Sequence, residues 1–150
     1  MDKKSKIFLV SGPTASGKSN FAIKLAKKIN GEIINADSMQ VYKEFKILTA
    51  RPNLKERKQI KHHLYGFLSV RKKFSTGQWL KLVFKTIKEI QKRNKIPILV
   101  GGTGLYFKAI TDGFVKIPKV TIKKRKTIIN IHKKLGQANF YKKLIKLDPK

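Results

Sequence analysis

One pattern constrains the fold of this chain more than any other: an apolar run, a glycine-containing loop and an amphipathic segment follow one another near the N-terminus. Residues 7–10 are all apolar and end at turn-forming residues, which predicts a buried parallel strand. Apolar residues recur every three or four positions over residues 18–29, which predicts a helix that Gly31 ends. A second strand predicted at residues 32–36 completes a β-α-β unit with parallel strands and a right-handed crossover.

The loop between the first strand and the helix follows the pattern G-x-x-x-x-G-K-[ST]. Its residues are Gly12, Pro13, Thr14, Ala15, Ser16, Gly17, Lys18 and Ser19. The glycines let the backbone curl so that successive N–H groups point at one phosphate, and the helix N-terminus behind them adds partial positive charge. Lys18 adds a full charge, and the Ser19 hydroxyl can ligate Mg²⁺. The pattern therefore predicts a phosphate-binding loop.

Asp37 ends the second predicted strand. In doubly wound sheets, ligands bind outside the carboxyl ends of the strands, so Asp37 is expected to face whatever the loop binds. It would serve there as a general base, a hydrogen-bond acceptor or a metal carboxylate. The alternative is that it caps a helix that starts at Ser38. ATPases usually have another strand that ends in Asp and helps to hold Mg²⁺, whereas the strand at residues 96–100 ends in glycines.

The rest of the first 114 residues continues the alternation of strands and helices. Residues 63–68 predict a third strand, and Ser75 with Gln78 predicts a capping box at the start of a helix. This helix is expected to bury Trp79, Leu82, Val83, Ile87 and Ile90. A further buried strand at residues 96–100 leads into a second glycine-rich turn, which is either purely structural or a ligand contact through Thr103.

Other residue types narrow the possible functions. Tyr65 and Trp79 are assigned to the core rather than to base stacking, whereas both roles stay open for Tyr106 because it follows the second glycine-rich turn. The pair His62 and His63 has no third ligand at a suitable spacing, so no metal site is expected there. The chain has no cysteine, no apolar run near the ~20 residues of a membrane span and no signal-peptide pattern, which favours a cytoplasmic protein without membrane attachment.

The charge is strongly basic, with 36 Lys and Arg against 8 Asp and Glu and a net charge of +28. Such a charge suggests nucleic acid, anionic membrane or phosphorylated ligands as partners. The alternative is a lysine-rich composition that follows from AT-rich coding. After Gly113 the sequence becomes basic and helical, with two amphipathic stretches separated by Gly136. We therefore expect an α/β core at residues 1–114 and a separate basic helical element at 115–150.

Four blocks of this sequence, in order, resemble the tRNA dimethylallyltransferases, also called tRNA isopentenyltransferases. The blocks are residues 12–19, 35–43, 49–52 and 97–106. The resemblance implies a doubly wound parallel P-loop core followed by the start of a basic helical tRNA-binding insertion. It also implies transfer of a dimethylallyl group from dimethylallyl diphosphate to the exocyclic amine of the adenosine on the 3′ side of the anticodon.

The resemblance also implies roles for individual residues. Residues 14–19 would hold the diphosphate together with Mg²⁺, Asp37 would accept the proton of the adenine amine, and Thr103 would contact the flipped-out adenosine. Contacts to tRNA would come from Ser38, Met39 and Gln40, and from Arg125, which aligns with a basic contact without gaps from Thr103. The expected partners are tRNA and dimethylallyl diphosphate, and the expected assembly is a monomer.

Family members are much longer than 150 residues, so the chain is expected to be incomplete, decayed or half of a split enzyme, with doubtful activity on its own. Two other functions compete with the resemblance. A small-molecule kinase would use the same loop for ATP and Asp37 to activate a hydroxyl. A basic fragment would bind RNA without chemistry, and its affinity would fall steeply with salt.

Overall fold

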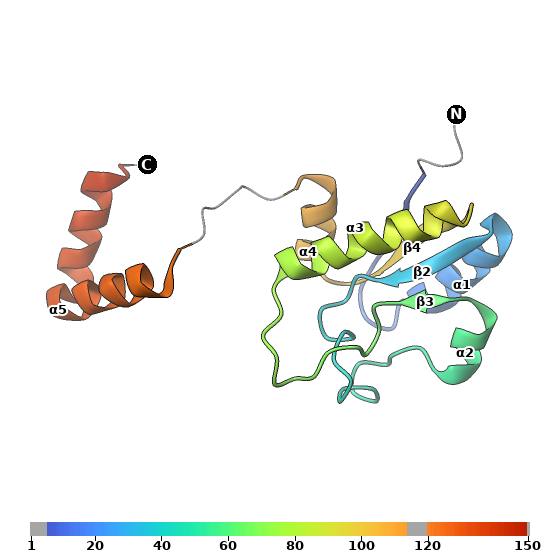
Figure 1. Ribbon diagram of the computed structural model, residues 1–150. Helices are drawn as coiled ribbons and strands as arrows, with labels where there is room; N and C mark the ends of the chain where they lie inside the picture. Colours follow the sequence, from blue (N-terminus) through green and yellow to red (C-terminus); the bar gives the residue numbers. More distant parts are fainter. Residues whose placement is uncertain (1–5, 114–119, 150) are drawn as a thin grey trace. The chain divides into compact units, whose positions relative to one another are not determined.

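The computed structural model describes residues 6–113 and 120–149. The chain divides into two compact units, Met1–Phe114 and Val115–Lys150 (Figure 1). Each unit is described below by itself.

The first unit is built on a parallel sheet. Its strands are β1 (Phe8–Ser11), β2 (Gly31–Asn35), β3 (His62–His63) and β4 (Ile96–Gly101). Their order across the sheet is β1-β4-β2-β3, and every neighbouring pair is parallel. Because β4 lies between β1 and β2 although it comes last in the chain, the connections run over both faces of the sheet. The predicted doubly wound α/β fold is confirmed.

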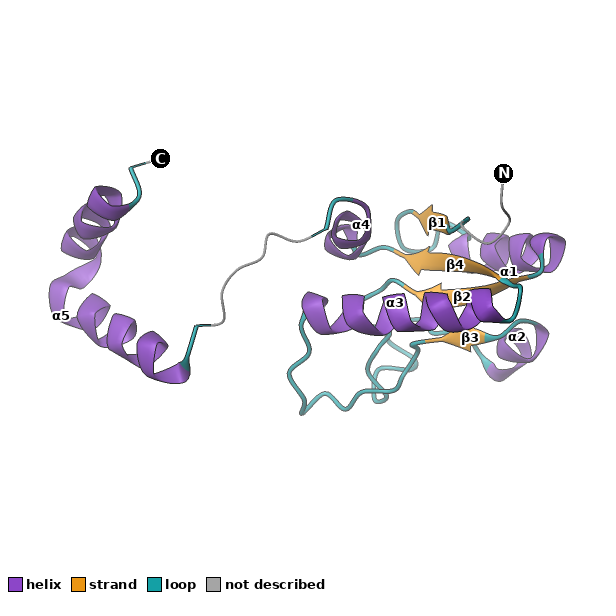
Figure 2. Ribbon diagram, turned by 45° about the horizontal axis from the view of Figure 1, so that its top comes forward, coloured by secondary structure: helices purple, strands orange, loops and turns teal. Residues whose placement is uncertain are grey.

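Helices cover both faces of this sheet, as Figure 2 shows. They are α1 (Lys18–Ile29) on one face and α3 (Thr76–Lys92) with α4 (Gly104–Thr111) on the other, whereas α2 (Leu54–Gln59) has no buried residue. Successive side chains of a strand point to opposite faces. Ile33 and Ile98 therefore pack against α1, whereas Ile34 and Leu99 pack against α3 and α4. Two separate apolar clusters hold the strands in place.

The helix α3 begins as predicted. The Ser75 hydroxyl accepts a hydrogen bond from the Gln78 backbone amide at 3.3 Å, and the Ser75 amide donates to the Gln78 side chain at 2.9 Å. Trp79 is fully buried, stacks on Tyr106 with ring centroids 3.9 Å apart, and donates from Nε1 to the Asn35 carbonyl at 3.1 Å. The assignment of Trp79 to the core is confirmed, and Tyr106, for which both roles were open, lies in the core as well.

Two strand predictions are wrong. The run at residues 7–10 is parallel but not buried, since Phe8 and Leu9 keep 36% and 43% of their surface exposed. The reason is that β1 is an edge strand, which pairs with β4 alone among the described residues. The third strand has only two residues, and the segment after it instead forms a single parallel bridge between Tyr42 and Leu68.

Two details of the predicted helices also differ. Asn30, rather than Gly31, takes the left-handed conformation that ends α1, with φ 55°. Gly31 begins β2, where a Cβ would lie 2.7 Å from the Ile98 side chain, so glycine serves strand packing there. Leu82 of α3 is only half-buried, because it lies at the margin of the apolar stripe that faces the sheet.

The second unit contains one helical element, α5 (Ile122–Leu147), with non-helical backbone at Gly136 (φ 70°, ψ 168°). It therefore consists of two helices joined by a kink, as predicted. The first starts at Thr121, whose hydroxyl accepts from the Lys124 amide at 3.3 Å. Across the kink, the rings of His132 and Phe140 meet edge to face at 4.8 Å. Over residues 6–113 and 120–149, no helix has the length and apolarity to cross a membrane.

A buried ion cluster lies at the amino-terminal end of β2, away from the predicted phosphate-binding loop at residues 12–19. Glu32 is 2% exposed, and its carboxylate lies 2.7 Å from Arg93, 2.6 Å from His63 and 3.4 Å from Lys95. Burial by itself would raise the pKa of this carboxyl, but the hydrogen bonds and charges of Arg93 and His63 outweigh it and lower the pKa to about 2. The cluster joins β2, β3 and the turn before β4.

We predict that Gly101→Ala destabilises the core. A Cβ at this position would lie 2.1 Å from the Ala36 carbonyl oxygen, so the carboxyl ends of β4 and β2 would have to move apart. We expect the free energy of unfolding, measured by urea denaturation, to fall by roughly 1–3 kcal/mol or more. Gly104→Ala is the matched control, because nothing lies within 4 Å of its Cβ position and alanine favours the helix that begins there. Equal stability of both variants would contradict the contact.

We predict that Glu32 makes stability depend on acid pH. A pKa lowered in the folded state means that the unfolded chain binds the proton more readily, so the contribution is complete above about 4.5 and is lost as the pH falls toward about 2. Glu32→Gln should lower the free energy of unfolding at pH 7 by roughly 1–3 kcal/mol, since Arg93 and Lys95 keep access to water. It should also flatten the profile between these pH values.

The control for this measurement is Glu89→Gln, which removes an exposed carboxylate from α3. Its unfolding profile should follow that of the unaltered chain. A profile for Glu32→Gln that is as steep as the unaltered one would contradict the role of the cluster.

Candidate functional site

Residues 12–19, the predicted phosphate-binding loop and below called the phosphate loop, connect β1 to α1 in a tightly curled conformation. Ala15 and Gly17 have positive φ angles of 62° and 79°, and the Ser16 amide donates to the Pro13 carbonyl at 3.4 Å. The Lys18 ammonium folds over the loop and also donates to the Pro13 carbonyl. Gly17 immediately precedes α1, so the free amides of the first helical turn open toward the inside of the loop. This backbone has the concave form that a phosphate group requires.

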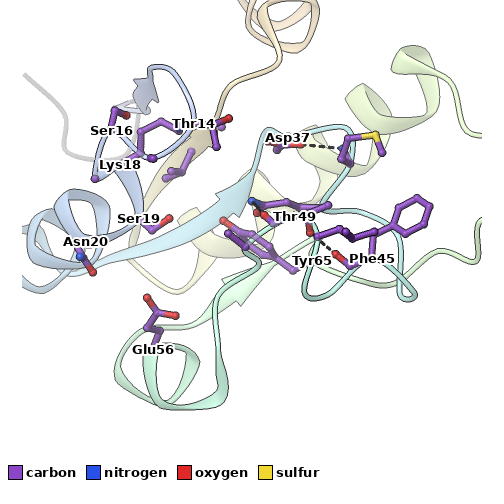
Figure 3. A pocket seen from close by; sticks show the side chains of 18 residues that line it. Thr14, Ser16, Lys18, Ser19, Asn20, Asp37, Phe45, Thr49, Glu56 and Tyr65 are labelled. Atoms are coloured by element: carbon purple, nitrogen blue, oxygen red, sulfur yellow. Dashed lines mark hydrogen bonds between the residues drawn. The ribbon is translucent and has the colours of Figure 1, made fainter.

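A cavity of about 570 Å³ adjoins the loop at the carboxyl ends of the strands. Figure 3 shows loop residues on one side of it and Asp37 across from them. Besides Asn20 at the start of α1, the residues that line it come from the loop, the end of β4, and the segment from Asp37 to Tyr65: Thr14, Ala15, Ser16, Gly17, Lys18, Ser19, Asp37, Met39, Gln40, Phe45, Leu48, Thr49, Ala50, Glu56, Tyr65, Val100 and Gly101. The Lys18 side chain and the loop amides thus face a wall that combines carboxylates with apolar side chains.

Asp37 is held in this wall by the buried side chain of Asn35. The Asp37 amide donates to Asn35 Oδ1 at 2.9 Å, and Asn35 Nδ2 donates to the Asp37 carbonyl at 2.9 Å and to the Leu64 carbonyl at 3.1 Å. The Asp37 carboxylate accepts from the Met39 amide through Oδ1 at 2.9 Å. It therefore caps a turn, and the alternative of a helix that starts at Ser38 is wrong. Among the described residues, Oδ2 accepts no hydrogen bond and is available to a ligand.

Thr103 and Ser38 are hydrogen-bonded to each other beside the cavity. Thr103 Oγ1 accepts from the Ser38 amide at 2.9 Å and lies 3.3 Å from the Ser38 hydroxyl. The bond ties the turn after β4 to the residue that follows Asp37. Gly101 in the same turn is needed for packing against Ala36. The glycine-rich turn thus has a structural role at Gly101, and Thr103 joins the two strand ends.

The structure brings most of the predicted site residues into one place. Loop residues from Thr14 to Ser19, Asp37, Met39 and Gln40 all line the cavity, and the Gln40 side chain also donates to the Thr49 carbonyl at 2.8 Å. Gly12 and Pro13 line a neighbouring shallow groove beside β1. Arg125 is an exposed residue of α5 in the second unit.

Sequence reasoning missed two polar residues of the wall. The expectation for Tyr65 is a core position, and its ring does pack on the apolar cluster beside α1, but the residue also lines the cavity. Burial raises the pKa of its phenol, and the nearby Asp37 carboxylate raises it further. Glu56 accepts from the Asn53 amide at 2.7 Å in the capping box of α2. The Asn53-x-x-Glu56 spacing was a detectable signal for that helix start.

The oxygen donors around the cavity are of the kind that Mg²⁺ prefers. They are the Ser19 hydroxyl and the carboxylates of Asp37 and Glu56. In the described part of the chain, no group of three or more His, Cys, Asp or Glu side chains is placed to hold a metal by itself. This donor set fits an ion that is shared with a bound phosphate better than an ion caged by protein alone.

Comparison with known proteins identifies the family. The model of the IPP transferase family matches residues 40–150, which is most of the chain. The chain belongs to the IPP transferase family.

The similar proteins are longer than this chain. The tRNA dimethylallyltransferase of Pelagibacter ubique is 69% identical over 150 residues, which are 100% of this chain and 48% of that protein. A solved tRNA isopentenylpyrophosphate transferase from Bacillus halodurans matches with 36% identity and a TM-score of 0.72, over 97% of this chain and 48% of that one. A eukaryotic dimethylallyltransferase acting on tRNA matches with 35% identity and a TM-score of 0.81, over 95% and 36%. This IPP transferase chain thus spans about half the length of the curated relatives it matches.

Proposed function

We propose that this chain forms the catalytic core of a tRNA dimethylallyltransferase. The observation that carries the proposal is the placement of Asp37 opposite the phosphate loop in one cavity. A ligand with a diphosphate at one end and a reactive carbon at the other would bridge these two features. The relatives' activity is thereby assigned to specific residues of this chain.

In this proposal the loop binds the diphosphate of dimethylallyl diphosphate. Lys18 and the amides of the loop neutralise the negative charge that grows on the leaving group as its C–O bond breaks. Ser19, with Glu56, would hold Mg²⁺ against the same phosphates, which leaves Asp37 free to act as the base. When bound, the ion adds positive charge at the departing oxygens.

Asp37 acts on the other reactant. The exocyclic amine of adenine is a poor nucleophile, so its proton must be accepted as the new bond forms. The amine nitrogen bonds to C1 of the dimethylallyl group, the bonding pair of the C–O bond leaves with diphosphate, and the Asp37 carboxylate takes the proton. The adenine must leave its stack in the tRNA to enter the cavity. Thr103 and Ser38 keep the backbone beside Asp37 in place through their mutual bonds.

The second unit binds tRNA in this proposal. From residue 120 to 149 the chain is rich in Lys and Arg, with Asp148 as its acid, and the side chains of α5 are largely exposed. Exposed cations on a helix neutralise backbone phosphates without reading bases. Arg125, Met39 and Gln40 are the proposed tRNA contacts, and we expect the protein to act as a monomer in the cytoplasm.

The test is a chimera in which these 150 residues replace the matching first half of the Pelagibacter ubique relative. We expect it to transfer labelled dimethylallyl groups to unmodified tRNA. Asp37→Asn keeps the acceptor for the Met39 amide but removes the base, so kcat should fall by about 10²–10⁴-fold. Glu89→Gln, an exposed change on α3, is the control and should leave kcat unchanged.

A different result would refute each part of the proposal. No transfer by the unaltered chimera would refute the function, and full activity of Asp37→Asn would refute the role of Asp37. Phosphoryl transfer from ATP to a small molecule would instead identify a kinase.

We predict that Arg125→Ala weakens tRNA binding mainly through electrostatics. Loss of one phosphate contact should reduce the slope of log affinity against log salt by about 1 and affect different tRNAs equally. The measurement is a salt titration of tRNA binding by the 150-residue chain. Lys85→Ala, on α3 of the first unit, is the matched control. Equal slopes for Arg125→Ala and the unaltered chain would contradict the contact.

A further inference from the structure

We propose that the Tyr65 hydroxyl is a further binding group of the cavity, and that it donates a hydrogen bond to a phosphate oxygen of the ligand on the loop. The inference rests on the proposed function, because it adds one contact to the diphosphate site described above. It concerns a residue that the sequence pattern had placed in the core.

The ring of Tyr65 is fixed from several sides. It packs against the apolar cluster between α1 and the sheet, and it meets the ring of His62 edge to face with centroids 5.6 Å apart. Just before it, Leu64 has a positive φ of 61°, and the Leu64 carbonyl accepts from Asn35 Nδ2 at 3.1 Å. The side chain that fixes Asp37 therefore also fixes the backbone next to Tyr65. A ring held in this way places its hydroxyl with little freedom.

The hydroxyl lies in the cavity and not in the core. Tyr65 is among the lining residues, and Figure 3 shows its ring between Asp37 and Glu56, with the oxygen directed toward the side on which Ser19 lies. Within the described residues, this hydroxyl forms no hydrogen bond. Its capacity to donate is thus available to a ligand. Tyr106, by contrast, is stacked on Trp79 in the apolar cluster on the other face of the sheet.

The chemistry of the surroundings keeps this group a donor. Burial and the negative charges of Asp37 and Glu56 raise the pKa of the phenol, while Arg57 acts in the opposite sense more weakly. The phenol therefore stays protonated at physiological pH. Phosphate oxygens only accept hydrogen bonds, whereas a dimethylallyl chain offers no acceptor. On the side of Lys18 and Ser19, the group that matches a phenol O–H is therefore the diphosphate.

The test compares Tyr65→Phe with the unaltered 150-residue chain, which contains both the loop and Tyr65. Binding of inorganic diphosphate and of dimethylallyl diphosphate, each with Mg²⁺, is measured by isothermal titration calorimetry. Loss of a hydrogen bond to a charged group should weaken both ligands by about 10- to 100-fold. The unfolding midpoint without ligand should not change, which separates a binding role from a structural one.

The matched control is Tyr42→Phe, which removes the same atom from a half-buried tyrosine of the same unit that is not among the lining residues. Its affinity should equal that of the unaltered chain. Equal affinity of Tyr65→Phe would overturn the inference and leave the proposed function standing. Weakening of dimethylallyl diphosphate alone would also overturn it, because the contact would then not be to phosphate. If the unaltered chain binds neither ligand and Lys18→Ala behaves the same, the diphosphate site and the inference fall together.

Discussion

The site depends on the close approach of two parallel strands at their carboxyl ends. Gly101 of β4 lies so near the Ala36 carbonyl that no side chain fits between them. The Ala36 amide then donates to the Val100 carbonyl at 2.8 Å, and Asn35 pins Asp37 just beyond. Because β1 pairs with the other side of β4, the phosphate loop is brought to the same edge. A wider spacing at this point would separate the carboxylate from the loop.

The carboxylates at the two ends of the sheet have different surroundings. At the amino-terminal end, Glu32 is enclosed by cations and contributes to stability. At the carboxyl end, Asp37 and Glu56 face a cavity together with Lys18, where we propose that the charges bind a ligand. In a chain with 8 acids and 36 Lys and Arg, the position of each carboxylate is informative. The net charge of +28 favours anionic partners in general and by itself selects none of them.

The wall opposite the loop is made by residues with structural bonds of their own. Gln40 donates to the Thr49 carbonyl, and Arg51 donates to the Tyr42 carbonyl at 3.0 Å with its guanidinium close to Gly66. These contacts tie parts of residues 38–66 to one another, although the segment contains little regular structure. Residues of the four sequence blocks that resemble the tRNA dimethylallyltransferases therefore shape the cavity as well as line it.

The sequence by itself determined the local elements and the chemistry: the phosphate loop, the helices α1 and α3, the capping box at Ser75 and the carboxylate at a strand end. These follow from periodicity and from short-range hydrogen bonds, which nearby residues decide. Only the tertiary structure decided that β1 is an exposed edge, that Gly101 packs on Ala36, that Glu32 is enclosed by Arg93, and that Tyr65 lines the cavity while its ring packs on the core. Each of these results from contacts between segments far apart in the chain, and strand order sets those contacts.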